Sequence, residues 1–296
     1  MGNRLTQRGV TPLGILFVLP AIAVIVFCGA IPIVNGIRYS LTSWDGVAPP
    51  RFVGLANYDK ALLHDPVHRK ALLNTLVLSV SCVVLQLVLG YAAANLLFQL
   101  KGFTAETGKV VLFMPYILSF AAVGVLFSFV FGTSDLGLLN KVIALFGAKP
   151  FPWLGSEYTA MPSVILTYAW KDFGFGMILY YAGLQSIPSS LLEAGEIDGA
   201  NAGQMTRWIK LPLLRSVTQT VAVLAVIHYM LTFTIIYFLT PNGGPNRATE
   251  VAATWFYKQS FQFMEFGYGA ALAAIMAAIV LALTLGLRRV IRSVPS

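Results

Sequence analysis

The sequence has few charged residues and few of the side chains that build catalytic or metal sites. Only 11% of its 296 residues are charged, whereas a soluble domain of this size carries about 25%. It contains three histidines and two cysteines, and 57% of its residues are hydrophobic. This composition argues against an ordinary soluble domain and indicates that the solvent of the chain is a lipid bilayer.

The scarcity of cysteine and histidine limits the chemistry open to the chain. Cys28 and Cys82 both fall in apolar stretches, so each is expected to be a small buried hydrophobic residue rather than half of a disulfide. His64 and His68 are four residues apart, but no dense cluster of further ligands joins them, and no metal site is expected there. No catalytic constellation is present, so we do not expect an enzyme.

A phosphate-binding P-loop is also missing from the sequence. Without a GxxxxGK segment, the chain does not bind and hydrolyse ATP by itself through such a loop, and we expect no cofactor on this chain. The formal net charge of +8 is compatible with nucleic acid. However, the basic residues are scattered beside apolar runs, so membrane topology explains them better and no nucleic-acid partner is expected.

Long hydrophobic runs divide the chain into six predicted membrane-spanning helices within a single domain, residues 1–296, and the fold class is all-α. The first run is too long for the core of a signal peptide, so we interpret it as an uncleaved span. A kink is expected at Pro115, and a short amphipathic helix at 136–146. The spans are expected at about 10–35, 74–98, 110–131, 162–184, 217–239 and 267–287.

The distribution of basic residues predicts the orientation of these spans. Six spans place both termini on one side of the membrane, together with the loop between the fourth and fifth spans. Short segments on that side carry ten Lys and Arg residues, whereas the much longer segments on the other side carry nine. Because basic residues concentrate in short cytoplasmic loops, both termini and this loop are expected in the cytoplasm.

The loop at 187–215 is the longest polar interruption of the chain. Ser190 followed by Glu193 has the spacing of a capping box, which predicts that a helix begins there. Gly199 is a plausible residue for the C-terminal end of that helix, and Pro212 is expected to end a second helical segment. A short helix outside the membrane, between two spans, is a natural contact surface for a soluble partner.

The sequence of this loop resembles the EAA loop of ABC importer permeases of the sugar-uptake kind. The resemblance rests on Glu193-Ala194-Gly195, Asp198-Gly199-Ala200 and Ile209-Lys210-Leu211-Pro212. In that family the loop is the coupling helix that docks into a groove of the ATP-hydrolysing subunit, which implies an ATPase-coupling role for these residues. The family usually has a second alanine where this chain has Gly195, at a cost of roughly 1 kcal/mol in helix propensity. Alternatively, Glu193 and Asp198 are only solvated cap residues.

Segments 52–58, 242–245 and 266–268 are also similar to sugar permeases, so the resemblance covers nearly the whole chain. It implies the type I importer permease fold and a place in the bacterial cytoplasmic (inner) membrane, in contact with membrane lipid. The implied partners are a second related permease subunit forming a heterodimer, a dimer of ATP-hydrolysing subunits that carries ATP and Mg, and an extracytoplasmic solute-binding protein.

Two charged residues lie deep in the fourth predicted span. Lys171 and Asp172 are about nine residues, or roughly 14 Å, into that span, close to the membrane midplane. Charges at that depth usually face a water-filled path or pair with one another, so both a solute-facing role and an interhelical ion pair are open. Adjacent helical residues point about 100° apart, so at least one of the two needs another partner.

Aromatic and polar residues accompany these charges on the helices that flank the loop. In maltose-type permeases these two helices line the sugar site, and the resemblance makes seven residues candidates for the solute path. They are Tyr168, Lys171, Asp172, Phe175, His228, Tyr229 and Thr232. The alternative for this set is ordinary membrane packing with polar contacts between helices.

The sequence therefore predicts a permease subunit of an ATP-driven, binding-protein-dependent importer for a sugar or sugar-like solute. The coupling loop is expected at 187–215. The alternative is an ion- or proton-coupled carrier that uses Lys171 and Asp172 as its relay, and a third reading is a structural scaffold without a transport path.

Overall fold

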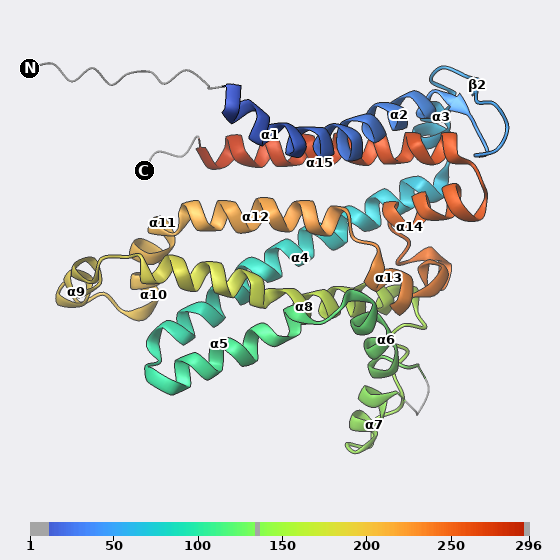
Figure 1. The fold of residues 1–296 in the computed structure, drawn as a ribbon. Helices are drawn as coiled ribbons and strands as arrows, with labels where there is room; N and C mark the ends of the chain where they lie inside the picture. The colour runs from blue at the N-terminus through green and yellow to red at the C-terminus, as the bar shows by residue number, and fades with distance from the viewer. Residues whose placement is uncertain (1–11, 134–136, 293–296) are drawn as a thin grey trace, which may run out of the picture.

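The computed structural model describes residues 12–133 and 137–292, and these are almost entirely helical (Figure 1). Within this part of the chain there is one small sheet, in which β1 (Thr42–Ser43) pairs antiparallel with β2 (Arg51–Phe52). The predicted all-α fold class is confirmed.

The centre of the fold is a pair of long helices, α4 (Pro66–Gln99) and α8 (Glu157–Gln185). They approach closely where two glycines meet: a Cβ atom on Gly90 would lie 3.0 Å from the backbone carbonyl carbon of Gly176. Small residues at a crossing let two helix backbones pack against each other without a hydrophobic side chain between them. Helix α12 (Arg215–Met230) packs on α4, and α15 (Phe266–Arg292) packs on α12 (Figure 1).

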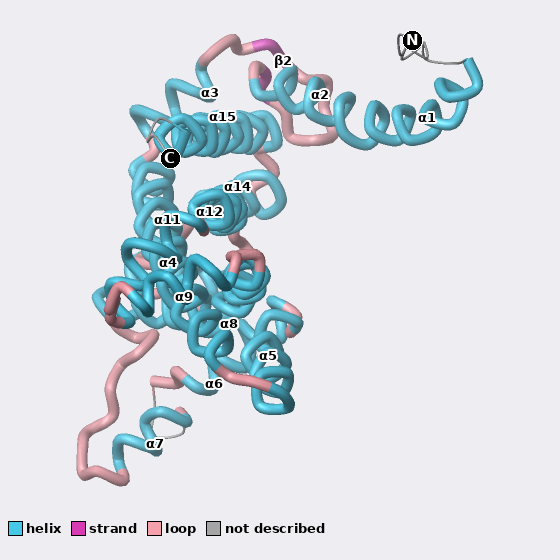
Figure 2. Tube along the Cα trace, turned by 90° about the vertical axis from the view of Figure 1, so that its left-hand side faces the viewer, coloured by secondary structure: helices cyan, strands magenta, loops and turns pink. Residues whose placement is uncertain are grey.

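The N-terminal helix lies on the outside of this body. It comprises α1 (Pro12–Ile25), a π-helical segment η1 (Val26–Ala30) and α2 (Ile31–Ser40). Its second half packs on α15, whereas α1 extends away from the rest of the chain (Figure 2). Cys28 is consequently exposed, so its predicted burial is wrong for this chain, while Cys82 in α4 is buried as predicted.

Two predicted spans are broken rather than continuous. Helices α5 (Gly102–Ile117) and α6 (Phe120–Val130) meet at 93°, so the span expected at 110–131 is not one helix. The kink expected at Pro115 lies just before this break. Helix α12 likewise ends at Met230, and α13 (Thr234–Leu239) follows after a three-residue break, so 217–239 is not one helix either.

By length and composition, three helices are able to cross a membrane: 16–40, α4 and α15. Counting each bent pair as one span, α5 with α6 and 202–213 with α12, gives up to five. Helix α8, which contains the predicted span 162–184, is not among them and carries Lys171 and Asp172 near its middle. The number of six spans stays a prediction.

Short elements complete the described chain. The predicted amphipathic helix at 136–146 corresponds to α7 (Leu138–Ala144), and its first expected residue lies outside the described part. The others are α3 (Ala56–Asp59), η2 (Lys60–His64), α9 (Ser189–Ile197), α10 (Ala202–Gln204), η3 (Met205–Lys210), α11 (Leu211–Leu213), η4 (Pro241–Gly243), η5 (Pro245–Arg247), α14 (Ala252–Tyr257) and η6 (Lys258–Gln262).

A buried ion pair holds the turn between α13 and α14. The Glu250 side chain is fully buried, and its carboxylate lies 2.6 Å from Lys258 Nζ and 2.7 Å from Thr254 Oγ1. Gly243, at φ +85°, passes so close that a Cβ atom there would lie 2.6 Å from Glu250 Oε2. This turn is at the end of the molecule opposite α9, whereas α1 begins and α15 ends toward the α9 end (Figure 1).

Candidate functional site

Asp172 lies at the contact between α8 and α12. Its side chain is only 1% exposed, and one carboxylate oxygen, Oδ2, lies 3.2 Å from Nε2 of His228. The backbone carbonyl of Asp172 accepts a hydrogen bond of 3.2 Å from the Gln86 amide on α4. Side chains of α4 and α12 therefore both bond to Asp172, Gln86 to its backbone carbonyl and His228 to its carboxylate, so the buried charge has a partner on a neighbouring helix.

Lys171 is equally buried, but its ammonium group points to another part of the fold. Nζ donates a hydrogen bond of 2.9 Å to the backbone carbonyl of Tyr116 and lies 4.0 Å from the ring centroid of Phe120. Its distance to Asp172 Oδ1 is 3.7 Å. As expected from their positions on the helix, the two charges each have a further partner. Lys171 binds the bend between α5 and α6, and Asp172 binds His228.

A cavity of about 200 Å³ lies beside the Asp172 carboxylate. Two aromatic rings on its wall, those of Tyr116 and Phe175, are stacked with centroids 5.3 Å apart. The chemistry of the wall thus combines a carboxylate, an imidazole and an amide with flat apolar faces. The lining residues are Gln86, Tyr116, Asp172, Phe175, Leu224, Ala225 and His228.

Six of the seven predicted solute-path residues fall into two groups, and Lys171, bound to the bend between α5 and α6, belongs to neither. Asp172, Phe175 and His228 line the cavity together. Tyr168, Tyr229 and Thr232 instead form a packed layer beside it. Tyr168 and Tyr229 are fully buried, with edge-to-face rings 5.7 Å apart, and the Tyr168 hydroxyl is hydrogen-bonded to Thr232 Oγ1.

Four lining residues were missed by the sequence analysis, the apolar Leu224 and Ala225 and the polar Gln86 and Tyr116. Gln86 is a lone amide in the apolar run of α4, and that isolation is the signal that could have identified it. Tyr116 follows the proline of the expected kink, but its position depends on the 93° bend, which the local sequence does not encode. Among the described residues no group of three or more His, Cys, Asp or Glu side chains could hold a metal ion.

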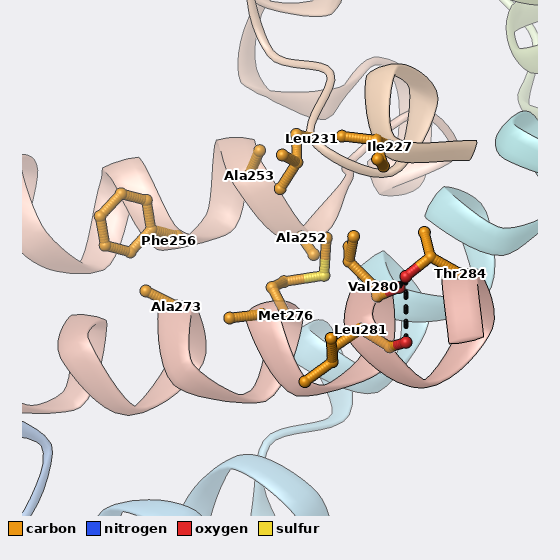
Figure 3. A pocket seen from close by; sticks show the side chains of 11 residues that line it. Ile227, Leu231, Ala252, Ala253, Phe256, Ala273, Met276, Val280, Leu281 and Thr284 are labelled. Carbon is orange, nitrogen blue, oxygen red and sulfur yellow. Dashed lines mark hydrogen bonds between the residues drawn. The ribbon is translucent and has the colours of Figure 1, made fainter. Parts of the chain in front are cut away.

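A second, apolar hollow of about 540 Å³ lies between α12, α14 and α15 (Figure 3). Ile227, Leu231 and Met276 are among its walls, and the hydroxyl of Thr284 is already bonded to the carbonyl of Val280 at 2.8 Å. Because the other lining side chains are apolar and the Thr284 hydroxyl is already bonded, this groove suits an apolar neighbour rather than a hydroxylated solute.

The loop at 187–215 forms a helical hairpin. Helix α9 ends at Ile197, and Gly199 follows at φ +77°. The amide of Gly199 bonds to the Glu196 carbonyl and that of Ala200 to the Gly195 carbonyl, both at 3.0 Å. These are the two bonds of a Schellman motif, so the expected role of Gly199 at the helix end is confirmed.

Two details of this hairpin differ from expectation. The predicted capping box at Ser190 is wrong, because α9 begins one residue earlier and has no side-chain cap, whereas Asn201 and Gln204 form a capping box at the second helix. Pro212 lies inside α11 rather than at its end, and the chain turns by 73° after Leu213.

Gly195 is buried at the contact between α9 and η3 in the hairpin. A Cβ atom on it would lie 2.5 Å from Cδ1 of Ile209 and 3.0 Å from Cε of Met205, so the glycine lets α9 pack closely on η3. Glu193, Ala194, Asp198 and Gly199 are exposed, and Ala200 is half-buried. The hairpin thus presents acidic side chains outward, and two large apolar side chains, Ile197 and Trp208, are exposed on it as well.

Comparisons with known proteins identify the family of the chain. The family model of the binding-protein-dependent transport system inner membrane component matches residues 86–294. The chain is 34% identical to the probable ABC transporter permease protein YurN of Bacillus subtilis, over 91% of this chain and 92% of that protein. It is also 34% identical to the xylose/arabinose import permease protein XacH of Haloferax volcanii, over 89% and 81% of the two chains.

The fold is similar to that of a solved ABC transporter. A chain in the crystal structure of the bacterial alginate ABC transporter, in complex with an alginate pentasaccharide-bound periplasmic protein, superposes with a TM-score of 0.81. The two chains are 20% identical, and the match covers 93% of this chain and 92% of that one. These similarities confirm the predicted family and the type I fold. The chain belongs to the binding-protein-dependent transport system inner membrane components and is a permease subunit of an ABC importer.

Proposed function

We propose that this permease carries a sugar or sugar-like solute and forms half of its translocation path. The observation that carries the proposal is the cavity in which the Asp172 carboxylate and His228 face the stacked rings of Tyr116 and Phe175. Sugars are recognised by hydrogen bonds to their hydroxyls and by apolar contact of their ring faces with aromatic side chains. The similarity to a xylose/arabinose import permease supports the same class of solute.

The coupling step is assigned to the hairpin around α9. Its exposed carboxylates, Glu193 and Asp198, would pair with donors in the groove of an ATP-hydrolysing subunit, and the exposed Ile197 would fill an apolar part of that groove. ATP and Mg would bind the ATPase dimer and not this chain, which has no catalytic role of its own. Closure of the dimer would pull on α9, and the rigid packing of Gly195 on η3 would pass the motion to α12.

The remaining partners follow from the same assignment. A second, related permease subunit would complete the path as a heterodimer, and an extracytoplasmic solute-binding protein would deliver the solute, as the periplasmic protein of the alginate complex supports. In this arrangement the chain crosses a bacterial inner membrane several times. The concentration of basic residues in short segments supports placing both termini and the α9 hairpin in the cytoplasm.

The experiment that tests this function is purification of the tagged chain from its native membrane in mild detergent, with mass spectrometry of the proteins that accompany it. We expect an ATPase, a second permease and a binding protein, and the binding protein is then screened against sugars. A Glu193→Lys variant should lose the ATPase but keep the second permease, whereas Asp45→Lys, an exposed acid at the other end of the molecule, should keep both.

The comparisons give no support to the ion-coupled alternative. Uptake should therefore stop when ATP is depleted and survive the addition of a protonophore. A chain that is purified without an ATPase would contradict the coupling role of the hairpin.

A further inference from the structure

A third hollow of about 320 Å³ lies between α12 and α15, on the side of the cavity nearer the α9 hairpin. Its polar walls are the Gln219 amide, the Thr220 hydroxyl and the Arg288 guanidinium. Gln219 and Thr220 are in the first turns of α12, and Arg288 is near the end of α15. These ends of the two helices lie toward the α9 hairpin (Figure 1).

This hollow and the Asp172 cavity share one wall. Leu224 lines both of them, and it is the only residue that the two linings have in common. Thr220, Leu224 and His228 follow one another at four-residue spacing along α12, so they lie on one face of the helix. At 1.5 Å per residue, Thr220 and His228 are roughly 12 Å apart along the helix axis, with Leu224 midway between them.

We propose that the two hollows are successive compartments of one solute path, and that Leu224 is the partition between the Asp172 cavity and a cytoplasmic exit mouth lined by Gln219, Thr220 and Arg288. This rests on the proposed function, because the exit is the cytoplasmic end only if the hairpin is cytoplasmic. The amide, hydroxyl and guanidinium of the mouth offer hydrogen bonds to a solute, and water replaces those bonds when the solute leaves.

The chemistry of the three side chains on α12 fits a gate. Leu224 is 43% exposed in this chain and places an apolar side chain between two polar compartments. A hydrophobic constriction between wetted compartments resists the passage of water and of hydrated solutes until it widens. Ile227, three residues after Leu224, lies at the edge of the face that these three side chains share and borders the apolar groove between α12, α14 and α15 (Figure 3).

The test measures access from each side of the membrane, so it does not require the solute to be known. Single cysteines are placed at Thr220, at His228 and, as a control, at Ile227, in a Cys28→Ser background of the complete complex, where Cys82 stays buried. Their reaction rates with a negatively charged, membrane-impermeant methanethiosulfonate are measured in inside-out and right-side-out vesicles without nucleotide.

We expect the Thr220→Cys variant to react about tenfold faster from the cytoplasmic side than from the outside. For the His228→Cys variant, adding Leu224→Ala should raise the cytoplasmic rate about fivefold, and adding Leu224→Trp should lower it by a similar factor. Neither change at Leu224 should alter the rate of the Thr220→Cys or the Ile227→Cys variant by more than about twofold.

Equal reaction of the Thr220→Cys variant from both sides, or none from the cytoplasm, would overturn the exit mouth. A His228→Cys rate that does not respond to Leu224 would overturn the partition. The rate is measured as the labelled fraction of assembled complex, so a variant that fails to fold is recognised by its missing complex and is not counted as unreactive. Leu285→Trp, at an exposed leucine outside both linings, is the control for the added volume of tryptophan. The proposed function fails by a separate result, the absence of an ATPase from the purified complex.

Discussion

The ammonium nitrogen of Lys171 lies 2.9 Å from the backbone carbonyl oxygen of Tyr116, which belongs to the last turn of α5. The last carbonyls of a helix have no partner within the helix, and in a membrane no water replaces that partner. Lys171 therefore satisfies a helix end at the point where the chain bends by 93° into α6. The sequence left two roles open for Lys171, a contact with solute or an ion pair. In the structure its charge is bound to the backbone of a neighbouring helix.

Replacing Lys171 by methionine should consequently weaken the fold more than it weakens solute recognition. It removes a charge-assisted hydrogen bond and the contact with the Phe120 ring, and it leaves Asp172 with less compensation. We expect the free energy of unfolding to fall by about 2–3 kcal/mol. Thermal unfolding of the detergent-purified chain measures this. Lys109→Met, which removes an exposed pair with Glu106, should cost less than about 1 kcal/mol.

Asp172→Asn should have the opposite profile. The amide has nearly the volume of the carboxylate, and Lys171 keeps its hydrogen bond to the Tyr116 carbonyl, so the unfolding free energy should fall less than in the Lys171→Met variant although Lys171 loses a nearby charge. The hydrogen bond to His228 loses its charge, and we expect uptake of the solute delivered by the copurifying binding protein to fall about tenfold or more. Thr167→Val is a matched control, because Thr167 is buried in the same helix and bonds only to the Ser163 carbonyl. Normal uptake by the Asp172 variant would remove this carboxylate from the solute path.

The positions of the helices could be read from the sequence, but their breaks could not. Apolar runs identify the helices because a segment that lies in lipid must consist mostly of apolar residues. The break at 231–233 contains neither glycine nor proline, and the break at 118–119 falls beyond the proline that predicted only a kink. Tertiary contacts lie at both breaks: Lys171 binds the Tyr116 carbonyl at the first, and the Tyr168 hydroxyl binds Thr232 at the second. Neither contact has a signature in the local sequence.

The candidate site was predictable to a similar extent. The depth of Asp172 and the helical position of His228 identified one wall of the cavity, because an ionisable residue in an apolar run is unusual. For Tyr168 and Tyr229 the sequence left both the solute path and ordinary packing open, since the spacing of side chains on one helix does not say which neighbour covers them. The close packing of Gly195 on η3 is likewise a contact between two segments of the hairpin.

The pH dependence of stability should report on Asp65, which begins α4. Its carboxylate accepts hydrogen bonds from the Tyr268 hydroxyl at 2.6 Å and from the Trp255 indole at 2.9 Å, besides two backbone amides. Burial raises the pKa of Asp65, but the hydrogen bonds from Tyr268, the His68 amide and Trp255 outweigh it and hold the pKa below its usual value.

A lowered pKa in the folded state means that this contribution to stability is complete above the unfolded pKa, about 3.9, and is lost as the pH falls through the lower folded value. Asp65→Asn should therefore lower the unfolding temperature at pH 7, and the difference should be smaller at about pH 3, below the unfolded pKa. Asp59→Asn, at an exposed acid in the preceding turn, serves as the control. A difference between the Asp65 variant and the parent chain that is the same at both pH values would contradict this account.

Gly195 permits a test of how closely α9 must pack on η3. Alanine at this position would restore the usual pattern of the family and favour the helix by about 1 kcal/mol. Its Cβ atom would meet the ends of two flexible side chains, Ile209 and Met205, which can rotate away at a cost of similar size. We therefore expect Gly195→Ala to retain the ATPase in the purified complex and to transport at close to the parental rate.

Gly195→Leu should behave differently, because no rotation of Ile209 and Met205 makes room for an isobutyl group between α9 and η3. Overpacking of this size costs about 1–3 kcal/mol, and here it would tilt α9 away from the position in which Glu193 and Asp198 face the ATPase. The expected result is a complex that keeps the second permease but loses the ATPase. If the leucine variant retained the ATPase and normal uptake, the hairpin would transmit motion without close packing at Gly195, and coupling would have to pass through the chain connection to α12 alone.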